Sequence, residues 1–136
     1  MTPSPQLVRA TSHYRKIQNE SRAAGADPVQ LVTMLYDELE LALGVIISML
    51  RQGEAISLTA PAHRARSILI GLDASLDRDN GGTLASSLSD IYVGMRVRLD
   101  QAIQSRNVDQ LVELKSGVET ISHAWRQVRD KVRETA

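Results

Sequence analysis

The sequence predicts an all-α protein, an antiparallel up-down-up-down four-helix bundle that follows a mobile N-terminal arm. Three observations lead to this prediction. The apolar mass, in a chain that is 43% hydrophobic, consists of Leu, Ile, Val, Ala and Met, a composition that favours helices. Apolar residues recur at spacings of three and four in several long stretches, whereas the alternation typical of strands is missing. Short connections join these stretches, and short connections favour antiparallel neighbours.

The first 26 residues differ from the rest of the chain. Pro, Ser, Thr and Gly residues interrupt any periodicity there, so we expect a mobile arm over residues 1–26 and a bundle domain over residues 27–136. Tyr14 and Ile17 lie three residues apart and can lie together on an apolar surface. The alternative is an arm that has no role, because chain ends usually fray.

The start of the first helix is the clearest local signal. Asp27 can accept hydrogen bonds from the free amides of the first turn, and Pro28 suits the first helical position. Gln30 can complete a capping box. We therefore predict a helix over residues 28–51, ended by Gly53.

The apolar arc of this first helix is wider than a core face requires. Apolar residues cover about two-thirds of its circumference, whereas a surface helix needs a stripe of about 100°. Either the helix is central in the bundle, or something else covers its outer flank. The core stripe is Leu31, Leu35, Leu39, Ala42, Ile46 and Met49; Met34, Leu41 and Val45 widen one side, and Val32, Tyr36, Leu43 and Ile47 widen the other.

Three more helices are predicted, over residues 58 or 61 to 76, 83–105 and 108–134. Ser57 or Thr59 is expected to cap the first of them, and Asn107 the last. The turn over residues 77–82 ends in a Gly pair that can supply a positive φ.

Each of these helices has its own core stripe of apolar residues at spacings of three and four. The last stripe includes Trp125 and resembles a coiled-coil seam, so Trp125 is expected to pack in the core. Met34 and Met95 are expected to fill gaps in the core. The stripes are Leu58, Ala62, Ala65, Leu69, Leu72 and Leu76, with Ile68 beside them; Leu84, Leu88, Ile91, Met95, Leu99 and Ala102; and Leu111, Leu114, Val118, Ile121, Trp125, Val128 and Val132.

A few apolar residues lie outside the stripes and are the best candidates for exposed contacts. They are Ile47, Ile70, Val93 and Val97. Tyr36 lies at the margin of the wide arc, where an apolar ring and a hydrated hydroxyl both make sense, and Tyr92 is similar. We therefore expect Tyr36→Ala to weaken partner binding more than it weakens folding.

No set of residues assembles a catalytic or metal site, so we predict no enzyme activity, no cofactor and no metal. The chain has no Cys, and its three His residues are far apart. Glu119 and His123 have the wrong spacing for a di-iron motif, and no second pair exists. The loop that begins at Asp77 has a Gly at its sixth position but Leu88 at its twelfth, which argues against an EF-hand.

The charge pattern excludes several partners. Sixteen basic and sixteen acidic residues are interspersed, so no basic footprint for nucleic acid exists. No apolar run is long enough to span a bilayer, and the N-terminus lacks the apolar core of a signal peptide. A cytoplasmic protein without membrane insertion is the simplest interpretation.

An ordered set of motifs resembles the FliS family of flagellar export chaperones. Each motif is weak by itself, but their order along residues 14–130 is specific. They are Tyr14 before the first helix, Asp27-Pro-x-Gln-Leu-Val-x-Met-Leu-Tyr-Asp37, Leu72-x-x-Ser-Leu-Asp77 with Gly81-Gly-x-Leu-Ala85, Leu88-x-x-Ile-Tyr92-x-x-Met95-x-x-x-Leu99-x-x-Ala102, and Ala124-Trp125-Arg126. The chain departs from the family at Glu38, Val93 and Gly94.

The resemblance implies a four-helix bundle and a partner, the disordered C-terminal segment of flagellin, which wraps around the bundle and is kept from polymerising before secretion. Other flagellar export or regulatory proteins are further possible partners. It also implies that Tyr14 and Ile17 form a displaceable lid. The alternative is a generic helical adaptor or homodimerisation module. Together with the pattern of apolar residues, the resemblance makes the candidate partner-binding residues Tyr14, Ile17, Val32, Tyr36, Ile47, Ile68, Ile70, Tyr92, Val93 and Val97.

Overall fold

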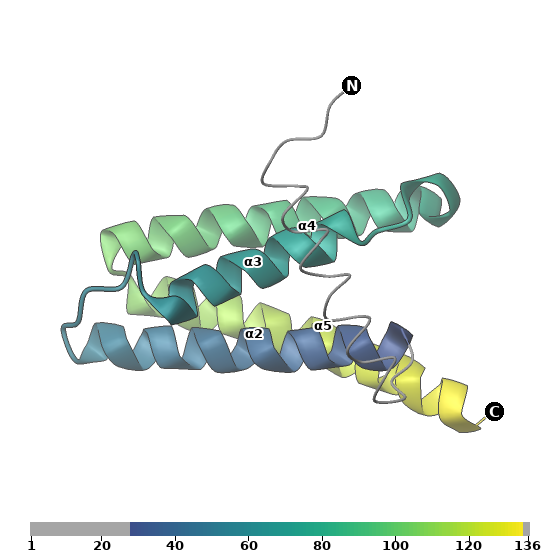
Figure 1. The fold of residues 1–136 in the computed structure, drawn as a ribbon, viewed down its shortest axis with the longest axis horizontal. Helices are drawn as coiled ribbons and strands as arrows, with labels where there is room; N and C mark the ends of the chain where they lie inside the picture. Colours follow the sequence, from purple (N-terminus) through teal and green to yellow (C-terminus); the bar gives the residue numbers. More distant parts are fainter. Residues whose placement is uncertain (1–27, 135–136) are drawn as a thin grey trace.

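The computed structural model describes residues 28–134 and contains four helices there, without a strand (Figure 1). They are α2 (Pro28–Arg51), α3 (Ala60–Ala74), α4 (Arg78–Ser105) and α5 (Val108–Glu134). The predicted arm, with Tyr14 and Ile17, lies outside the described residues. The all-α prediction is confirmed.

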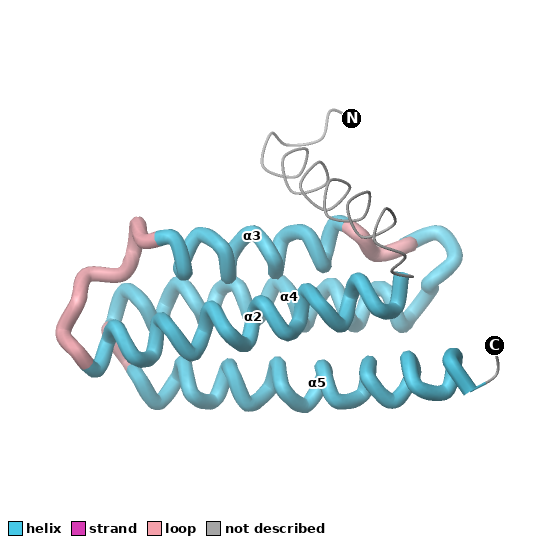
Figure 2. Tube along the Cα trace, turned by 60° about the horizontal axis from the view of Figure 1, so that its bottom comes forward, coloured by secondary structure: helices cyan, strands magenta, loops and turns pink. Residues whose placement is uncertain are grey.

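Each helix packs against two neighbours, which makes the structure a four-helix bundle. Helix α2 packs against α3 and α5, and α4 packs against the same two, so α2 and α4 lie diagonally across the bundle. Successive helices run in opposite directions, as Figures 1 and 2 show. The α2–α5 packing is the most extensive, and the α4–α5 packing is the least.

The described helix ends follow the sequence signals in part: α3 ends at Ala74, two residues before its predicted end, and the predicted cap Asp27 lies outside the described residues. Asn107 Oδ1 accepts a hydrogen bond of 3.1 Å from the Gln110 amide, as the predicted cap requires. Thr59 occupies the cap position of α3, but its hydroxyl donates to the Ile56 carbonyl (2.6 Å) and makes no cap bond. Helix α4 begins with one turn before its predicted start, and Gly82, at φ 53°, breaks the helix after that turn.

The core is one cluster of buried residues that includes residues of all four helices. Met95 is buried as predicted, and Trp125 packs against the core while half-buried. The buried cluster is Leu35, Tyr36, Leu39, Ala42, Leu43, Ile46, Ile47, Leu50, Ile56, Ala62, Ala65, Ile68, Leu69, Leu72, Tyr92, Met95, Leu99, Ala102, Ile103, Leu111, Leu114 and Val118.

Several predicted core residues are exposed. Leu58 precedes α3 and is 85% exposed, because the helix that was to bury it starts two residues later. Leu84, Ile91 and Val128 are exposed because α4 and α5 pack least against each other. Met34 is exposed on the outer side of α2, so the prediction that it fills a core gap is wrong.

Candidate functional site

The outer side of α2 carries an apolar stripe that no helix of the described bundle covers. Met34, Leu41 and Val45 follow one another at spacings of seven and four, which places them on one face. All three are exposed, and Leu41 is 72% exposed. We call these three residues the α2 stripe. The stripe forms one flank of the wide apolar arc of α2. The other flank includes Tyr36 and Ile47, which are buried.

Two shallow hollows lie between α2 and α5, and the first of them borders on the α2 stripe. One, of about 450 Å³, is lined by α2 residues that include Leu41 and Val45, together with Lys115 of α5. The other, of about 490 Å³, includes Val112 and Ile47. Both hollows share Gly44 and Lys115, because the Lys115 stem crosses α2 there: a Cβ added at Gly44 would lie 3.6 Å from Lys115 Cε. We call the two hollows together the α2–α5 groove.

Exposed apolar residues also follow the seam between α4 and α5. A Cβ added at Gly117 would lie 4.0 Å from Met95 Cε, so these residues are opposite each other. Because α4 and α5 are antiparallel, one turn before Met95 on α4 lies level with one turn after Gly117 on α5, so Ile91 is level with Ile121. About two turns further in the same direction, Leu84 is level with Val128. Leu84 is 69% exposed, and Ile91 and Val128 are exposed. We call Leu84, Ile91, Ile121 and Val128 the α4–α5 flank.

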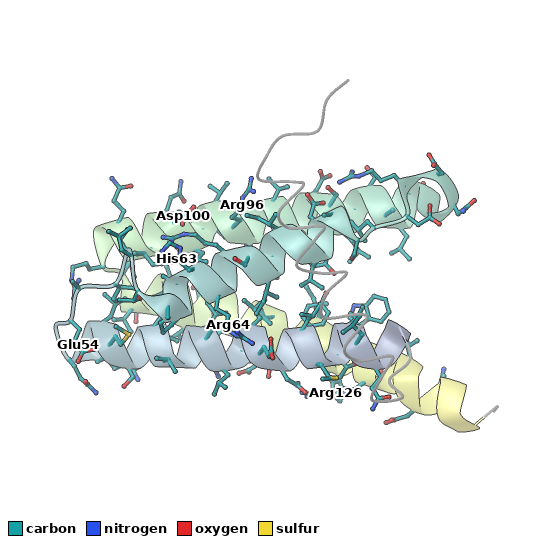
Figure 3. The ribbon with its side chains drawn as sticks, in the orientation of Figure 1. Glu54, His63, Arg64, Arg96, Asp100 and Arg126 are labelled. Atoms are coloured by element: carbon teal, nitrogen blue, oxygen red, sulfur yellow. The ribbon has the colours of Figure 1, made fainter. Side chains whose placement is uncertain are left out.

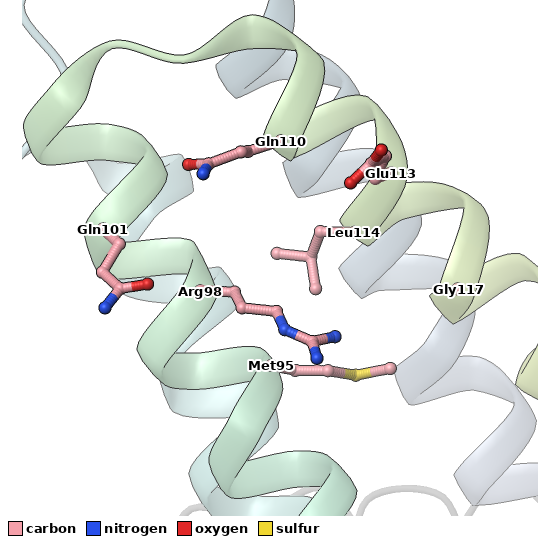
Figure 4. A pocket seen from close by; sticks show the side chains of 7 residues that line it. All are labelled: Met95, Arg98, Gln101, Gln110, Glu113, Leu114 and Gly117. Carbon is pink, nitrogen blue, oxygen red and sulfur yellow. The ribbon is translucent and has the colours of Figure 1, made fainter.

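The opposite end of the same seam is polar. A hollow of about 450 Å³ lies between α4 and α5, with buried Met95 and Leu114 in its lining. Figure 4 shows Met95 and Arg98 extending from α4 toward α5, with Gln110 and Leu114 extending from α5 into the same space. The seam therefore changes from charged and amide groups to exposed apolar groups along its length.

A third apolar surface lies between α3 and α4 and is bordered by polar pairs. Arg66 Nε donates to Asp100 Oδ1 (2.6 Å) on one side. The Ser89 hydroxyl donates to Asp73 Oδ1 (2.6 Å) on the other. Between these two levels lie Ile70 of α3, which is half-buried, and Val93 and Val97 of α4, which are exposed; we call these three the α3–α4 patch. Figure 3 labels Arg96 and Asp100 along the same stretch of α4.

Tyr14 and Ile17 lie outside the described residues, and the other eight predicted binding residues divide into three groups. Val93 and Val97 are exposed as expected, and Val32 and Ile70 are half-buried. Tyr36, Ile47, Ile68 and Tyr92 are buried in the core, so the expected exposure of Ile47 is wrong for this structure, while contact of these four residues with a partner stays a prediction. Helix α5 lies beside this flank of α2, since Ile47 lines a hollow together with α5 residues and Tyr36 is hydrogen-bonded with Trp125.

Tyr36 and Tyr92 meet inside the bundle. Their hydroxyl groups are hydrogen-bonded, and their ring centroids lie 6.5 Å apart at 43°. Burial raises the pKa of Tyr36 far above its ordinary value, and the nearby Tyr92 adds to this, while a hydrogen bond with Trp125 opposes it. Tyr36 is therefore a neutral phenol at any physiological pH. The pair joins the diagonal helices α2 and α4, and its role is structural rather than ionic.

Two ion pairs at the surface connect neighbouring helices. Arg64 of α3 pairs with Glu38 of α2 at 2.7 Å, and Arg126 of α5 pairs with Asp37 of α2. Figure 3 labels the two arginines. All four side chains are at least a third exposed, so each pair stabilises the fold only weakly. Glu38, one of the positions where the chain departs from the family, has Arg64 as the partner of its carboxylate.

The described residues offer no metal site and no membrane-spanning segment. Within residues 28–134, no group of three His, Asp or Glu side chains could hold a metal ion. No helix in that range is long and apolar enough to cross a membrane. His63 and His123 are exposed, and His13 lies outside the described residues. What the described surface provides is apolar contact area with charged borders.

The sequence is similar to one family of known proteins over most of its length. The profile of the family described as "Flagellar protein FliS" matches residues 10–132. The flagellar secretion chaperone FliS of Salmonella typhimurium is 33% identical over 119 residues, which cover 87% of this chain and 88% of the relative. FliS of Escherichia coli is 30% identical over 130 residues, 88% and 89% of the two chains. FliSB of Pseudomonas aeruginosa is 27% identical and covers 85% and 98%.

The family profile spans nearly the whole chain, and the fold described above is the helical bundle that the resemblance implied. The chain belongs to the FliS family of flagellar secretion chaperones.

Proposed function

We propose that the protein binds the disordered C-terminal segment of flagellin in its apolar grooves, and so prevents flagellin from polymerising before secretion. The protein acts in the cytoplasm by occupying an assembly surface, without a chemical step. The proposal goes beyond the family membership in naming the bound protein and the bound segment.

The observation that supports the proposal most is the amount of apolar surface outside the core. The α2 stripe, the α4–α5 flank and the α3–α4 patch lie on different sides of the bundle. A rigid globular partner would cover one of them. A disordered chain that folds on binding can follow several, forming helices in successive grooves.

The energetics suit such a partner. Covering apolar surface contributes roughly 25 cal/mol per Å², and ordering a flexible chain offsets part of that gain. The affinity is then moderate for a large covered area, which suits a partner that must be released again for secretion. Occupying the flagellin segment blocks assembly, because the same apolar residues cannot pack in a filament at the same time.

The test compares full-length flagellin with flagellin that lacks its C-terminal segment. Size-exclusion chromatography and calorimetry with full-length flagellin should show a 1:1 complex, and the truncated protein should show none. Equal binding of the two forms would reject the wrapping model, and no binding of either would reject flagellin as the partner.

The second candidate is a homodimerisation module. The spacing of seven and four in the α2 stripe is the spacing of a coiled-coil seam, which a second copy could cover. Light scattering of the isolated protein separates the two functions. A tight dimer without affinity for flagellin would favour dimerisation, whereas a monomer that binds flagellin would exclude it.

A further inference from the structure

The α2–α5 groove contains a carboxylate oxygen that lacks a partner. Glu40 Oε1 is buried and, within the described residues, has no hydrogen-bond partner. Glu40 lines the hollow that holds Leu41 and Val45, one turn before Gly44. Leaving a buried charged oxygen without a donor is costly, so such groups are normally paired.

The other carboxylates of the groove already have partners, and the Arg51 cation of the second hollow lies about three turns further along α2 than Glu40. Lys115, which lines the same hollow as Glu40, donates from Nζ to Glu119 Oε1 at 2.7 Å. Asp37, at the end of the same hollow, pairs with Arg126. Glu40 is therefore the carboxylate that remains for a charge brought by another molecule.

The apolar residues beside Glu40 indicate the shape of that molecule. Leu41 and Val45 are exposed along one side of the hollow, and Val112 is exposed beyond the Lys115 stem. A helix that covers these residues and carries a cation at one position would satisfy both the apolar surface and the carboxylate. A residue without hydrogen-bond donors at that position would leave Glu40 unpaired.

We propose that Glu40 is a specificity-determining residue, which pairs with one Lys or Arg of a flagellin helix bound along the α2–α5 groove. This inference rests on the proposed function, since it names a contact of the same complex. The Lys or Arg enters beside the Lys115 stem, and its charge-assisted hydrogen bond replaces the missing partner of Glu40.

The experiment measures the affinity of a fluorescently labelled flagellin C-terminal segment for the full chain by anisotropy at several salt concentrations. Glu40→Gln should raise the Kd about tenfold, which is the scale for losing one charge-assisted pair, and should lower the salt dependence of binding. The matched control is Glu54→Gln, which removes the same charge from the exposed connection between α2 and α3. Thermal unfolding of Glu40→Gln should match that of the unaltered protein, which separates pairing with flagellin from a role in the fold.

A scan of the segment then identifies the partner side chain. Replacing each Lys and Arg of the segment by Gln should reveal one change that weakens binding to the unaltered protein but not to Glu40→Gln. Equal Kd values for Glu40→Gln and Glu54→Gln would overturn the inference while leaving the proposed function standing. Failure of the unaltered protein to bind the segment would overturn both, and a dimer of the protein alone that Glu40→Lys separates would assign the groove to a second copy.

Discussion

Two leucines two residues apart show how α2 serves the fold on one side and binding on the other. Leu39 is completely buried among residues of the neighbouring helices, whereas Leu41 is 72% exposed on the outer stripe. Both have the same side chain and the same backbone conformation. The difference shows that the apolar residues of α2 have two roles: those on the inner side stabilise the bundle, and those on the outer side remain available for contact with a partner.

The comparison is tested most strongly by the two alanine substitutions. Leu39→Ala removes buried methyl groups and leaves a cavity, so it should lower the free energy of unfolding by about 2–5 kcal/mol. Leu41→Ala should change it by no more than about 0.5 kcal/mol, because the side chain is exposed. Urea unfolding followed by circular dichroism measures both. If the two variants lost similar stability, the outer stripe would belong to the core.

Binding should respond in the opposite order. The double variant Leu41→Ser with Val45→Ser should bind flagellin about tenfold more weakly, since each exposed side chain contributes by being covered. Its unfolding transition should stay close to that of the unaltered protein. Calorimetric titration with flagellin gives the affinity, and Ala55→Ser, an exposed change in the connection after α2, is the control. Unchanged affinity of the double variant would remove the α2 stripe from the binding surface.

The tyrosine pair tests the inner side of the comparison with a smaller change. Tyr36→Phe removes one hydroxyl of a buried hydrogen bond, so it should lower the free energy of unfolding by about 1–2 kcal/mol. Tyr92→Phe should behave similarly, and the double variant should lose less than the two losses added together. A double-mutant cycle in urea measures this coupling. Strict additivity would mean that the two hydroxyls do not stabilise each other.

The same two sides of α2 show what sequence patterns can predict and what they cannot. The four helices, the bundle and the excess apolar arc follow from spacings within each helix, and the structure confirms them, although α3 and α4 differ from their predicted bounds. Which flank of the arc stays exposed depends on where α5 packs, and periodicity within one helix holds no information on that. The candidate list took Tyr36 and Ile47 from the flank that α5 covers, and omitted Leu41 and Val45.

A similar limit applies along the other helices. Val93 and Val97 lie on a face of α4 that points away from every stripe, so their exposure was predictable. Leu84 and Ile91 lie on the stripe itself and are exposed only because α4 and α5 diverge from close packing. Glu40 could not be recognised at all, because a carboxylate without a partner is a property of its surroundings.

The smallest expected change in stability concerns the turn where α4 begins. The amide of Asn80 donates to Asp77 Oδ1 at 3.1 Å and its side chain donates to Oδ2 at 2.9 Å, and these bonds lower the pKa of the Asp77 carboxyl. A carboxyl whose pKa is lower in the folded state stabilises the fold above its unfolded pKa and loses that effect as the pH falls through its folded pKa.

Asp77→Asn should therefore lower the melting temperature slightly at neutral pH, and the difference should shrink as the pH falls below about 4 and disappear below the lowered pKa of Asp77. Melting curves between pH 7 and pH 2.5 measure the difference, with Asp90→Asn as the control. Asp90 is exposed in the middle of α4 and caps no helix end, so its substitution should produce no comparable pH-dependent difference. A difference for Asp77→Asn that stays constant down to pH 2.5 would show that the amide is merely a poorer fit at this turn, and that the charge of the cap contributes nothing.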